Sequence, residues 1–215
     1  MTTMPVDPAT LLAFAAASAV LLAVPGPTII MVISQALAHG HRVAFASVLG
    51  VGLGDLLCAT LSLIGVGTVL AASAYAFTLI KWVGAAYLIW IGISMWRAPV
   101  TPLELDQDNM SAKSKSWPVF RDAFLVTLFN PKGIVFFLAF VPQFISPEES
   151  FAPQAAVLAS VFVVLGIANA AAYALLAGSA RQWIRQPNIL RIATRAGAAF
   201  LISAGLASLF IRRAT

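Results

Sequence analysis

Long runs of apolar residues are the feature of this sequence that most restricts its fold. The hydrocarbon core of a bilayer is about 30 Å thick, and a helix needs roughly 20 apolar residues to cross it. Backbone polar groups find no water there, so each run has to satisfy its own hydrogen bonds as a helix. The sequence therefore predicts an all-α integral membrane protein with six transmembrane helices. The six runs are residues 8–38, 43–80, 76–96, 123–147, 151–180 and 192–211.

The composition excludes an ordinary soluble domain. Of the 215 residues, 60% are hydrophobic and 10% are charged, whereas about a quarter of the residues in soluble domains are charged. The net charge of +5 does not indicate a nucleic-acid partner, because the basic residues lie at the edges of the apolar runs. We expect the lipid bilayer to surround this chain and no nucleic acid to bind it.

The positions of the basic residues predict how the chain is oriented. Nine Lys and Arg residues follow the first, third and fifth spans, whereas Lys81, Arg212 and Arg213 lie on the other side. Cytoplasmic loops are enriched in Lys and Arg, so we expect both termini outside the cell. The polar linker, residues 98–120, is then cytoplasmic. It separates a first three-helix unit, residues 1–97, from a second, residues 121–215.

The two halves of the chain are similar in sequence. Residues 84–89 read GAAYLI and residues 197–202 read GAAFLI, while residues 52–55, GLGD, correspond to residues 166–169, GIAN, at nearly the same separation. Each half has an odd number of spans, so the second copy must enter the membrane from the opposite side. This pattern predicts two inverted three-helix repeats, an architecture in which transporters bind substrate near the bilayer midplane.

Proline-containing motifs predict a break in the first helix of each repeat. Proline lacks a backbone N–H and clashes with the preceding helical turn. The half-helix after a break begins with unpaired N–H groups and a partial positive charge, which suit a carboxylate. We therefore expect the breaks to bind substrate, although a kink that only shapes packing is the alternative. The motif residues are Pro25, Gly26 and Pro27 in the first span and Asn130, Pro131, Lys132 and Gly133 in the fourth.

Asp55 and Lys132 are the charged residues expected deepest in the membrane. A charge at a helix centre costs about 2.5–3.5 kcal/mol by insertion scales, so both side chains should face the protein interior or water. Asp55 could bind a substrate ammonium or carry the coupling proton, and Lys132 could hold a substrate carboxylate or neutralise Asp55. A static ion pair or a side chain extending to the membrane surface is the alternative. Asn130 and Asn169 are further substrate ligands, or they join helices to one another.

Small residues predict close helix packing. Gly50 and Gly54 are four residues apart, which lets another helix approach beside Asp55. Small residues on the second, third and sixth spans are also compatible with a homodimer.

The sequence contains no recognisable motif for catalysis or for a cofactor. Cys58 is the single cysteine, which excludes an intramolecular disulfide and a zinc cluster. No phosphate-binding loop or Ser-His-Asp set is present. We expect a protein that is not an enzyme and that holds neither metal nor cofactor.

Several of these motifs together resemble the LysE and RhtB type of amino-acid exporters. The resemblance covers nearly the whole chain and is most specific in the first four spans. It implies six helices in a bacterial inner membrane, efflux driven by the proton motive force, and substrates among amino acids and their derivatives. The matching residues are Pro25-Gly26-Pro27, Gly50 to Asp55, residues 81–88, Asn130-Pro131-Lys132, Phe136-Phe137 and Pro142-Gln143-Phe144.

Three classes of function remain open at this point. Proton-coupled export of an amino acid is the leading hypothesis. Export of a metal cation or another small solute would need several carboxylates within the membrane, and only Asp55 is present. A non-transporting membrane scaffold is the third class.

Overall fold

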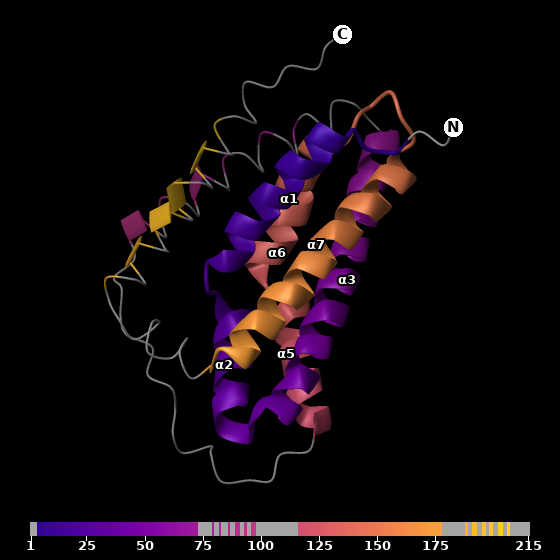
Figure 1. Ribbon diagram of the computed structural model, residues 1–215. Helices are drawn as coiled ribbons and strands as arrows, with labels where there is room; N and C mark the ends of the chain where they lie inside the picture. The colour runs from indigo at the N-terminus through magenta and orange to yellow at the C-terminus, as the bar shows by residue number, and fades with distance from the viewer. Residues whose placement is uncertain are drawn as a thin grey trace.

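The computed structural model describes residues 4–72 and 116–177, together with single positions between residues 79 and 97 and between 188 and 206. All regular secondary structure in these residues is helical (Figure 1). The predicted all-α class is therefore confirmed. Most of the predicted third and sixth spans, and most of the linker, lie outside the described residues.

The first span consists of two helices, as its proline motif predicts. Helix α1, Pro8–Ala23, begins where the Asp7 carboxylate accepts hydrogen bonds from the N–H groups of Ala9 and Thr10 at 3.0 and 3.1 Å. Helix α2, Pro27–His39, follows after three residues and is bent by 57° from α1. Gly40, with a φ of 77°, then reverses the chain. Glycine tolerates that left-handed conformation without a steric penalty.

Two continuous helices are long and apolar enough to cross a membrane. They are α3, His41–Ala72, in which residues 43–68 meet that criterion, and α7, Phe151–Leu175. Large apolar side chains of α3 remain exposed, as a lipid-facing surface requires. They include Phe45, Leu49, Leu53, Leu56, Leu61 and Ile64.

The fourth span is also broken at its predicted motif. Helix α5, Ser116–Leu128, is followed by α6, Pro131–Val135, by a π-helical turn η1, Phe136–Phe140, and by a 3₁₀ turn η2, Val141–Phe144. The parts before and after the break differ in direction by 41°. Helix α5 begins at Ser116, seven residues before the predicted apolar run and inside the predicted linker. Hydropathy locates the part of a helix inside the membrane, whereas the helix itself continues into polar surroundings.

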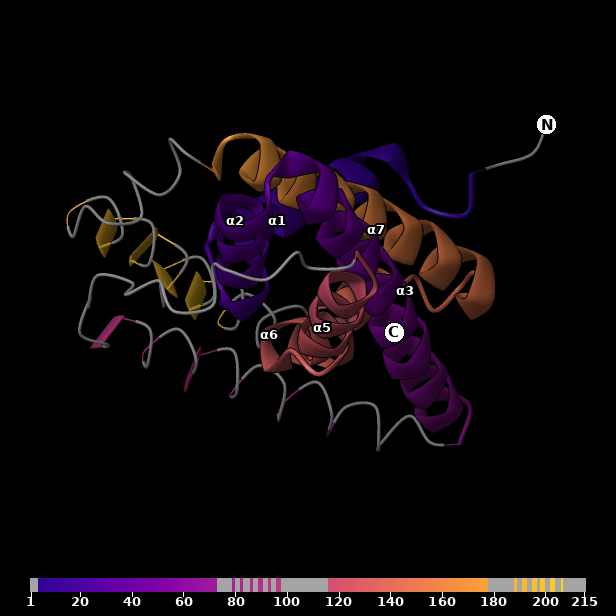
Figure 2. The ribbon, with the colours of Figure 1, turned by 90° about the horizontal axis from the view of Figure 1, so that it is seen from below.

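Helices α5 and α7 both pack along α3 (Figures 1 and 2). A Cβ atom on Gly54 would lie 2.9 Å from the Phe124 carbonyl oxygen of α5, and one on Gly50 would lie 3.0 Å from the Phe124 nitrogen. A Cβ atom on Gly52 would lie 2.7 Å from the Ile167 side chain of α7. The predicted close approach beside Asp55 is thus present, and glycine is what permits it.

The core has two parts, one on each side of the helix breaks. An aromatic cluster fills the half where α1 and α7 begin, and a cluster of small and β-branched residues fills the half where α2 ends and α3 begins. The aromatic cluster contains Phe14, Phe136, Phe137, Phe140 and Phe162, with Phe162 ring centroids 5.0 and 4.8 Å from those of Phe136 and Phe137. The second cluster contains Ile29, Val32, Ile33, Ala36, Val48, Val51, Ala170 and Ala174.

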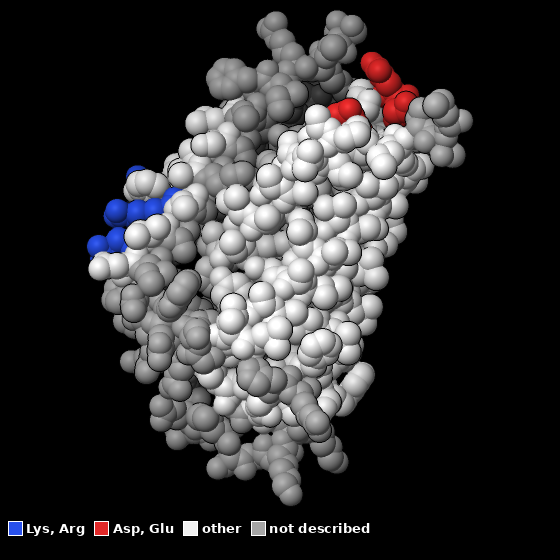
Figure 3. All heavy atoms as spheres, viewed as in Figure 1, with Lys and Arg blue, Asp and Glu red and all other residues white. Residues whose placement is uncertain are grey.

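The exposed acidic residues near the helix starts gather at one end of the bundle. Asp7 precedes α1, and Glu148 and Glu149 precede α7, so these acidic residues share one end. Acidic side chains are gathered at that end in Figure 3, and the white surface directly below them shows no charged side chain, whereas Lys or Arg side chains lie on the left edge of the view. Arg121 lies near the start of α5, at the opposite end. An apolar flank between two polar ends is the surface that a membrane-embedded protein presents.

Candidate functional site

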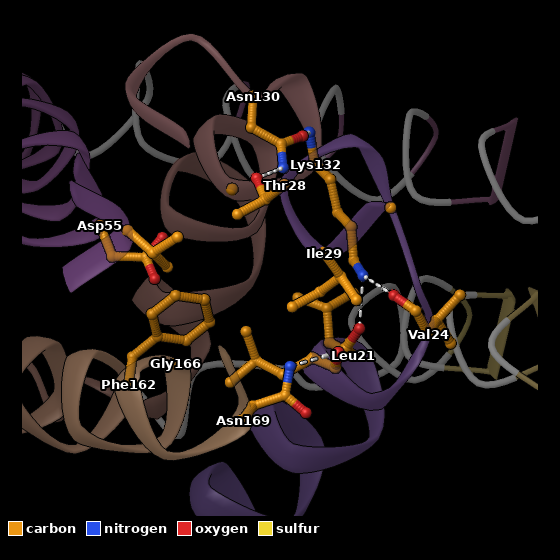
Figure 4. Close-up of a pocket in the computed structure, with 14 residues that line it drawn as sticks. Leu21, Val24, Thr28, Ile29, Asp55, Asn130, Lys132, Phe162, Gly166 and Asn169 are labelled. Atoms are coloured by element: carbon orange, nitrogen blue, oxygen red, sulfur yellow. Dashed lines mark hydrogen bonds between the residues drawn. The ribbon is translucent and has the colours of Figure 1, made fainter. Parts of the chain in front are cut away.

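A cavity of about 40 Å³ lies between the two helix breaks (Figure 4). It is lined from five directions: the end of α1, the start of α2, the middle of α3, the α5–α6 break and α7. Five of the eight residues predicted to bind substrate line it, and the three prolines form the breaks without lining it. The lining residues from that prediction are Gly26, Asp55, Asn130, Lys132 and Asn169.

The proline motif explains why α1 ends at this cavity. In a continuous helix, the N–H of residue 25 would donate to the Leu21 carbonyl, and that of residue 27 would donate to the Ala23 carbonyl. Pro25 and Pro27 have no N–H to donate. These carbonyls therefore need partners from elsewhere in the protein, since an unsatisfied carbonyl inside a membrane is costly.

Side chains from α6 and α7 supply those partners. The Lys132 ammonium donates to the Leu21 carbonyl and, at 2.9 Å, to the Val24 carbonyl. Asn169 Nδ2 donates to the Leu22 carbonyl at 3.1 Å, and the Tyr173 hydroxyl donates to the Ala23 carbonyl at 3.0 Å. Four consecutive carbonyls at the end of α1, from Leu21 to Val24, are thus capped by three side chains.

Asn130 connects the two breaks. Its Oδ1 accepts a hydrogen bond from the Lys132 N–H at 3.1 Å and so caps the start of α6. Its Nδ2 donates to Thr28 Oγ1 at 3.1 Å, across to the first turn of α2. The buried Thr127 hydroxyl is 3.4 Å from the same Thr28 oxygen. Asn130 therefore joins helices, one of the two roles considered for it, and also lines the cavity.

The start of α2 presents unpaired backbone donors to the cavity. Gly26 is the N-cap residue and provides no side-chain cap. The first backbone bond of this helix runs from Ile30 to Gly26. Within the described residues, the N–H groups of Thr28 and Ile29 have no acceptor, and both residues line the cavity. This helix end is suited to a negatively charged group.

Asp55 lies on the other side of the cavity from the Lys132 ammonium (Figure 4). Only 8% of its surface is exposed, and no donor in the described part of the chain forms a hydrogen bond or a salt bridge with its carboxylate. A Cβ atom on Gly166 would lie 2.5 Å from Asp55 Oδ2. The static Asp55–Lys132 ion pair considered from the sequence is therefore not formed. A buried carboxylate without a partner is a functional candidate.

Sequence reasoning missed several residues of this site. Tyr173 lies one helical turn after Asn169 on α7, so the 3.6-residue period could have identified it. Thr28 directly follows the Pro-Gly-Pro motif. Phe162 gave no signal, and Gly166 appeared only in the repeat alignment, because the importance of an apolar residue or a glycine depends on which side chains lie opposite. Within the described ranges, no group of three His, Cys, Asp or Glu residues could hold a metal ion.

Comparison with known proteins identifies the family. A family model described as LysE type translocator matches residues 19–212. The chain belongs to the LysE type translocator family. The resemblance inferred from the sequence motifs is thus confirmed. The matched region of this translocator includes both helix breaks and every residue that lines the cavity.

Several relatives of this LysE type translocator are similar over most of its length. An uncharacterized membrane protein of Vibrio cholerae is 38% identical, over 83% of this chain and 86% of the relative. The homoserine/homoserine lactone efflux protein of Salmonella typhimurium is 35% identical, over 85% of this chain and 87% of the relative. The leucine efflux protein of Klebsiella pneumoniae is 32% identical over 58% of each chain. No solved structure matches the translocator.

Proposed function

We propose that this translocator exports amino acids or their derivatives across the bacterial inner membrane by proton antiport. The observation that carries this proposal is the pairing of two unsatisfied groups in one cavity. Among the described residues, the Asp55 carboxylate on one side of the cavity has no hydrogen-bond partner, and the Thr28 and Ile29 amides at the start of α2 have no acceptor. An amino acid has an ammonium for the first and a carboxylate for the second.

The residues around the cavity have distinct roles in this proposal. Asp55 binds the substrate ammonium, and the α2 terminus exposed by Pro25, Gly26 and Pro27 binds the substrate carboxylate. Pro131 creates the second break. Three further residues complete the substrate site: Asn130 at the α5–α6 break, Lys132 on α6 and Asn169 on α7. The names of the Salmonella and Klebsiella relatives, which are efflux proteins for homoserine or its lactone and for leucine, support an amino-acid substrate.

Asp55 also carries the coupling proton. An ionised Asp55 attracts the substrate ammonium, whereas a protonated Asp55 has no charge with which to bind it. Substrate and proton therefore exclude each other at one carboxylate. Mutually exclusive binding is the requirement for exchanging one for the other across the membrane.

Two inverted three-helix repeats, residues 1–97 and 121–215, form the transporter in this proposal. The broken pairs α1–α2 and α5–α6 run in opposite directions, as do α3 and α7 (Figure 1). Asp55 of α3 and Asn169 of α7 occupy corresponding positions in the two repeats, and both line the cavity. These relations support a pseudo-twofold arrangement around the site.

Everted membrane vesicles test the proposed export. Their cytoplasmic face is outward, so an exporter accumulates substrate inside when the lumen is acidic. Homoserine and leucine are the first probes. We expect accumulation in vesicles with the wild-type protein, and we expect Asp55→Asn to abolish the part that depends on the proton gradient.

Asp122→Asn is the matched control, since it makes the same chemical change at an exposed carboxylate that pairs with Arg121 at 2.8 Å. It should transport like the wild type. Absence of accumulation across all amino acids would contradict amino-acid export, and a screen of metal cations and other solutes would then take precedence. Gradient-independent accumulation that Asp55→Asn leaves unchanged would contradict the proton coupling alone.

A further inference from the structure

We infer that the carbonyl end of α1 is a cation site and that Lys132 fills it permanently with a tethered ammonium. This translocator therefore operates without a free metal cation at that position. The inference concerns an ion site and does not depend on which solute is carried.

The end of α1 has the properties of a cation site. The Pro-Gly-Pro motif leaves its last carbonyls without helical donors, as described above, and the C-terminal end of a helix carries a partial negative charge. In transporters built from broken helices, unwound carbonyls and the C-terminal ends of half-helices coordinate Na⁺. The carbonyls of Leu21 and Val24 converge here on one positively charged atom, the Lys132 nitrogen.

The geometry of Lys132 indicates a resident cation. Its side chain starts at the second break and passes along the first, where a Cβ atom on Gly26 would lie 3.9 Å from Lys132 Cδ. Its ammonium bonds to two backbone carbonyls of α1, and Asp55 lies on the opposite side of the cavity (Figure 4). An ammonium is a compact charge with three donors. It can therefore bond to both carbonyls at the position that a metal ion would otherwise occupy.

The four capped carbonyls have two kinds of donor, the charged Lys132 ammonium and neutral side-chain groups. Asn169 and Tyr173 satisfy the Leu22 and Ala23 carbonyls with uncharged donors. Removing either leaves one unpaired carbonyl, which a free cation coordinates poorly. Removing the Lys132 ammonium leaves two carbonyls facing one vacated position, which a free cation could occupy.

The test measures whether small cations replace the missing ammonium in purified Lys132→Ala. Thermal unfolding is followed during titration with methylammonium or with Na⁺, and choline keeps the ionic strength constant. We expect the Tm of Lys132→Ala to start below the wild-type value, to rise with methylammonium or Na⁺, and to saturate, as binding to the folded state requires. The wild type should not respond.

Transport by reconstituted Lys132→Ala supplies the second readout. Counterflow exchange of homoserine or leucine is measured because it needs no proton gradient. Methylammonium is a weak base and would collapse such a gradient. We expect exchange to be lost in choline and to recover severalfold with the cation that raises Tm. Lys132→Met, whose side chain has no hydrogen-bond donor, is measured in parallel in case the alanine variant does not fold.

Two controls make the result specific. Tyr173→Phe removes the neutral donor that bonds to the Ala23 carbonyl at the end of α1. Added cations should therefore raise neither the Tm nor the exchange rate of this variant. Lys132→Arg keeps a tethered cation and should also show no response. The inference is overturned if neither Lys132→Ala nor Lys132→Met responds to methylammonium or Na⁺, or if the wild type itself requires Na⁺. If the wild type exports no amino acid but the Tm of Lys132→Ala depends on the added cation, the proposed function is overturned and the cation site is still supported.

Discussion

At the scale of single residues, the site depends on small side chains as much as on charged ones. Gly166 lies directly against the Asp55 carboxylate, so that any larger residue there would occupy the same space. Gly166 is buried in α7, and Asp55 faces it from α3. The position of the functional carboxylate is therefore set by a glycine more than a hundred residues away in the sequence.

Substituting Gly166 by Ala should impair transport by displacing Asp55. The added methyl group would lie 2.5 Å from Asp55 Oδ2, and overpacking of this kind costs about 1–3 kcal/mol. We expect efflux to fall by roughly tenfold or more, since each 1.4 kcal/mol needed to keep Asp55 in its native position lowers the transport-competent fraction tenfold. Gly65→Ala is the matched control, because a Cβ atom there meets nothing within 4 Å. Equal efflux by the two variants would show that Gly166 does not position Asp55.

At the scale of secondary structure, the broken helix is a consequence of two missing amides. Pro25 and Pro27 remove the donors for the Leu21 and Ala23 carbonyls, and Lys132 and Tyr173 replace them. The break is thus a competition between local helical bonds and long-range caps. Restoring a local donor should shift the competition towards a straight helix.

Pro25→Ala restores the N–H that can bond to the Leu21 carbonyl. A proline inside a helix costs about 3 kcal/mol, so its removal should leave Tm unchanged or raise it. Transport should fall nevertheless, by about tenfold for each ~1.4 kcal/mol by which the straight helix is favoured. Thermal unfolding and vesicle efflux measured on the same preparation separate the two effects. Pro153→Ala, in the first turn of α7, where the N–H has no helical acceptor, should change neither. Undiminished efflux by Pro25→Ala would mean that the break is not needed.

At the scale of the whole molecule, the arrangement of helices predicts a single orientation in the membrane. Asp7, Glu148 and Glu149 lie at one end of the bundle, and the start of α5 lies at the other. The bias of basic residues in the sequence predicts that this acidic end is outside the cell.

Cysteine labelling in intact cells tests this orientation. Replacing the buried Cys58 by Ala gives a background without thiols. We expect Glu148→Cys in this background to react with a membrane-impermeant maleimide in intact cells, because the predicted topology puts the loop before α7 outside the cell. Ser116→Cys, at the start of α5, should react only after the cells are permeabilised. The reverse pattern would contradict the proposed topology.

The sequence by itself determined the membrane class, the positions of two continuous candidate spans and of two bent helix pairs, and both helix breaks. These features are local: apolar length decides whether a segment can cross the bilayer, and proline removes a helical donor wherever it occurs. The cost of buried charge likewise singled out Asp55 and Lys132 before any fold was known. Helix ends were less predictable, as the early start of α5 shows, because polar residues also continue a helix.

Only the tertiary structure decided which polar groups meet. It placed the Lys132 ammonium on the carbonyls of Leu21 and Val24, left Asp55 without a donor from the described ranges, and joined Asn130 to Thr28. These partners lie on different helices, about a hundred residues apart. Their contacts depend on how closely α5 and α7 approach α3, and glycine packing sets that distance. No local pattern in the sequence contains that information.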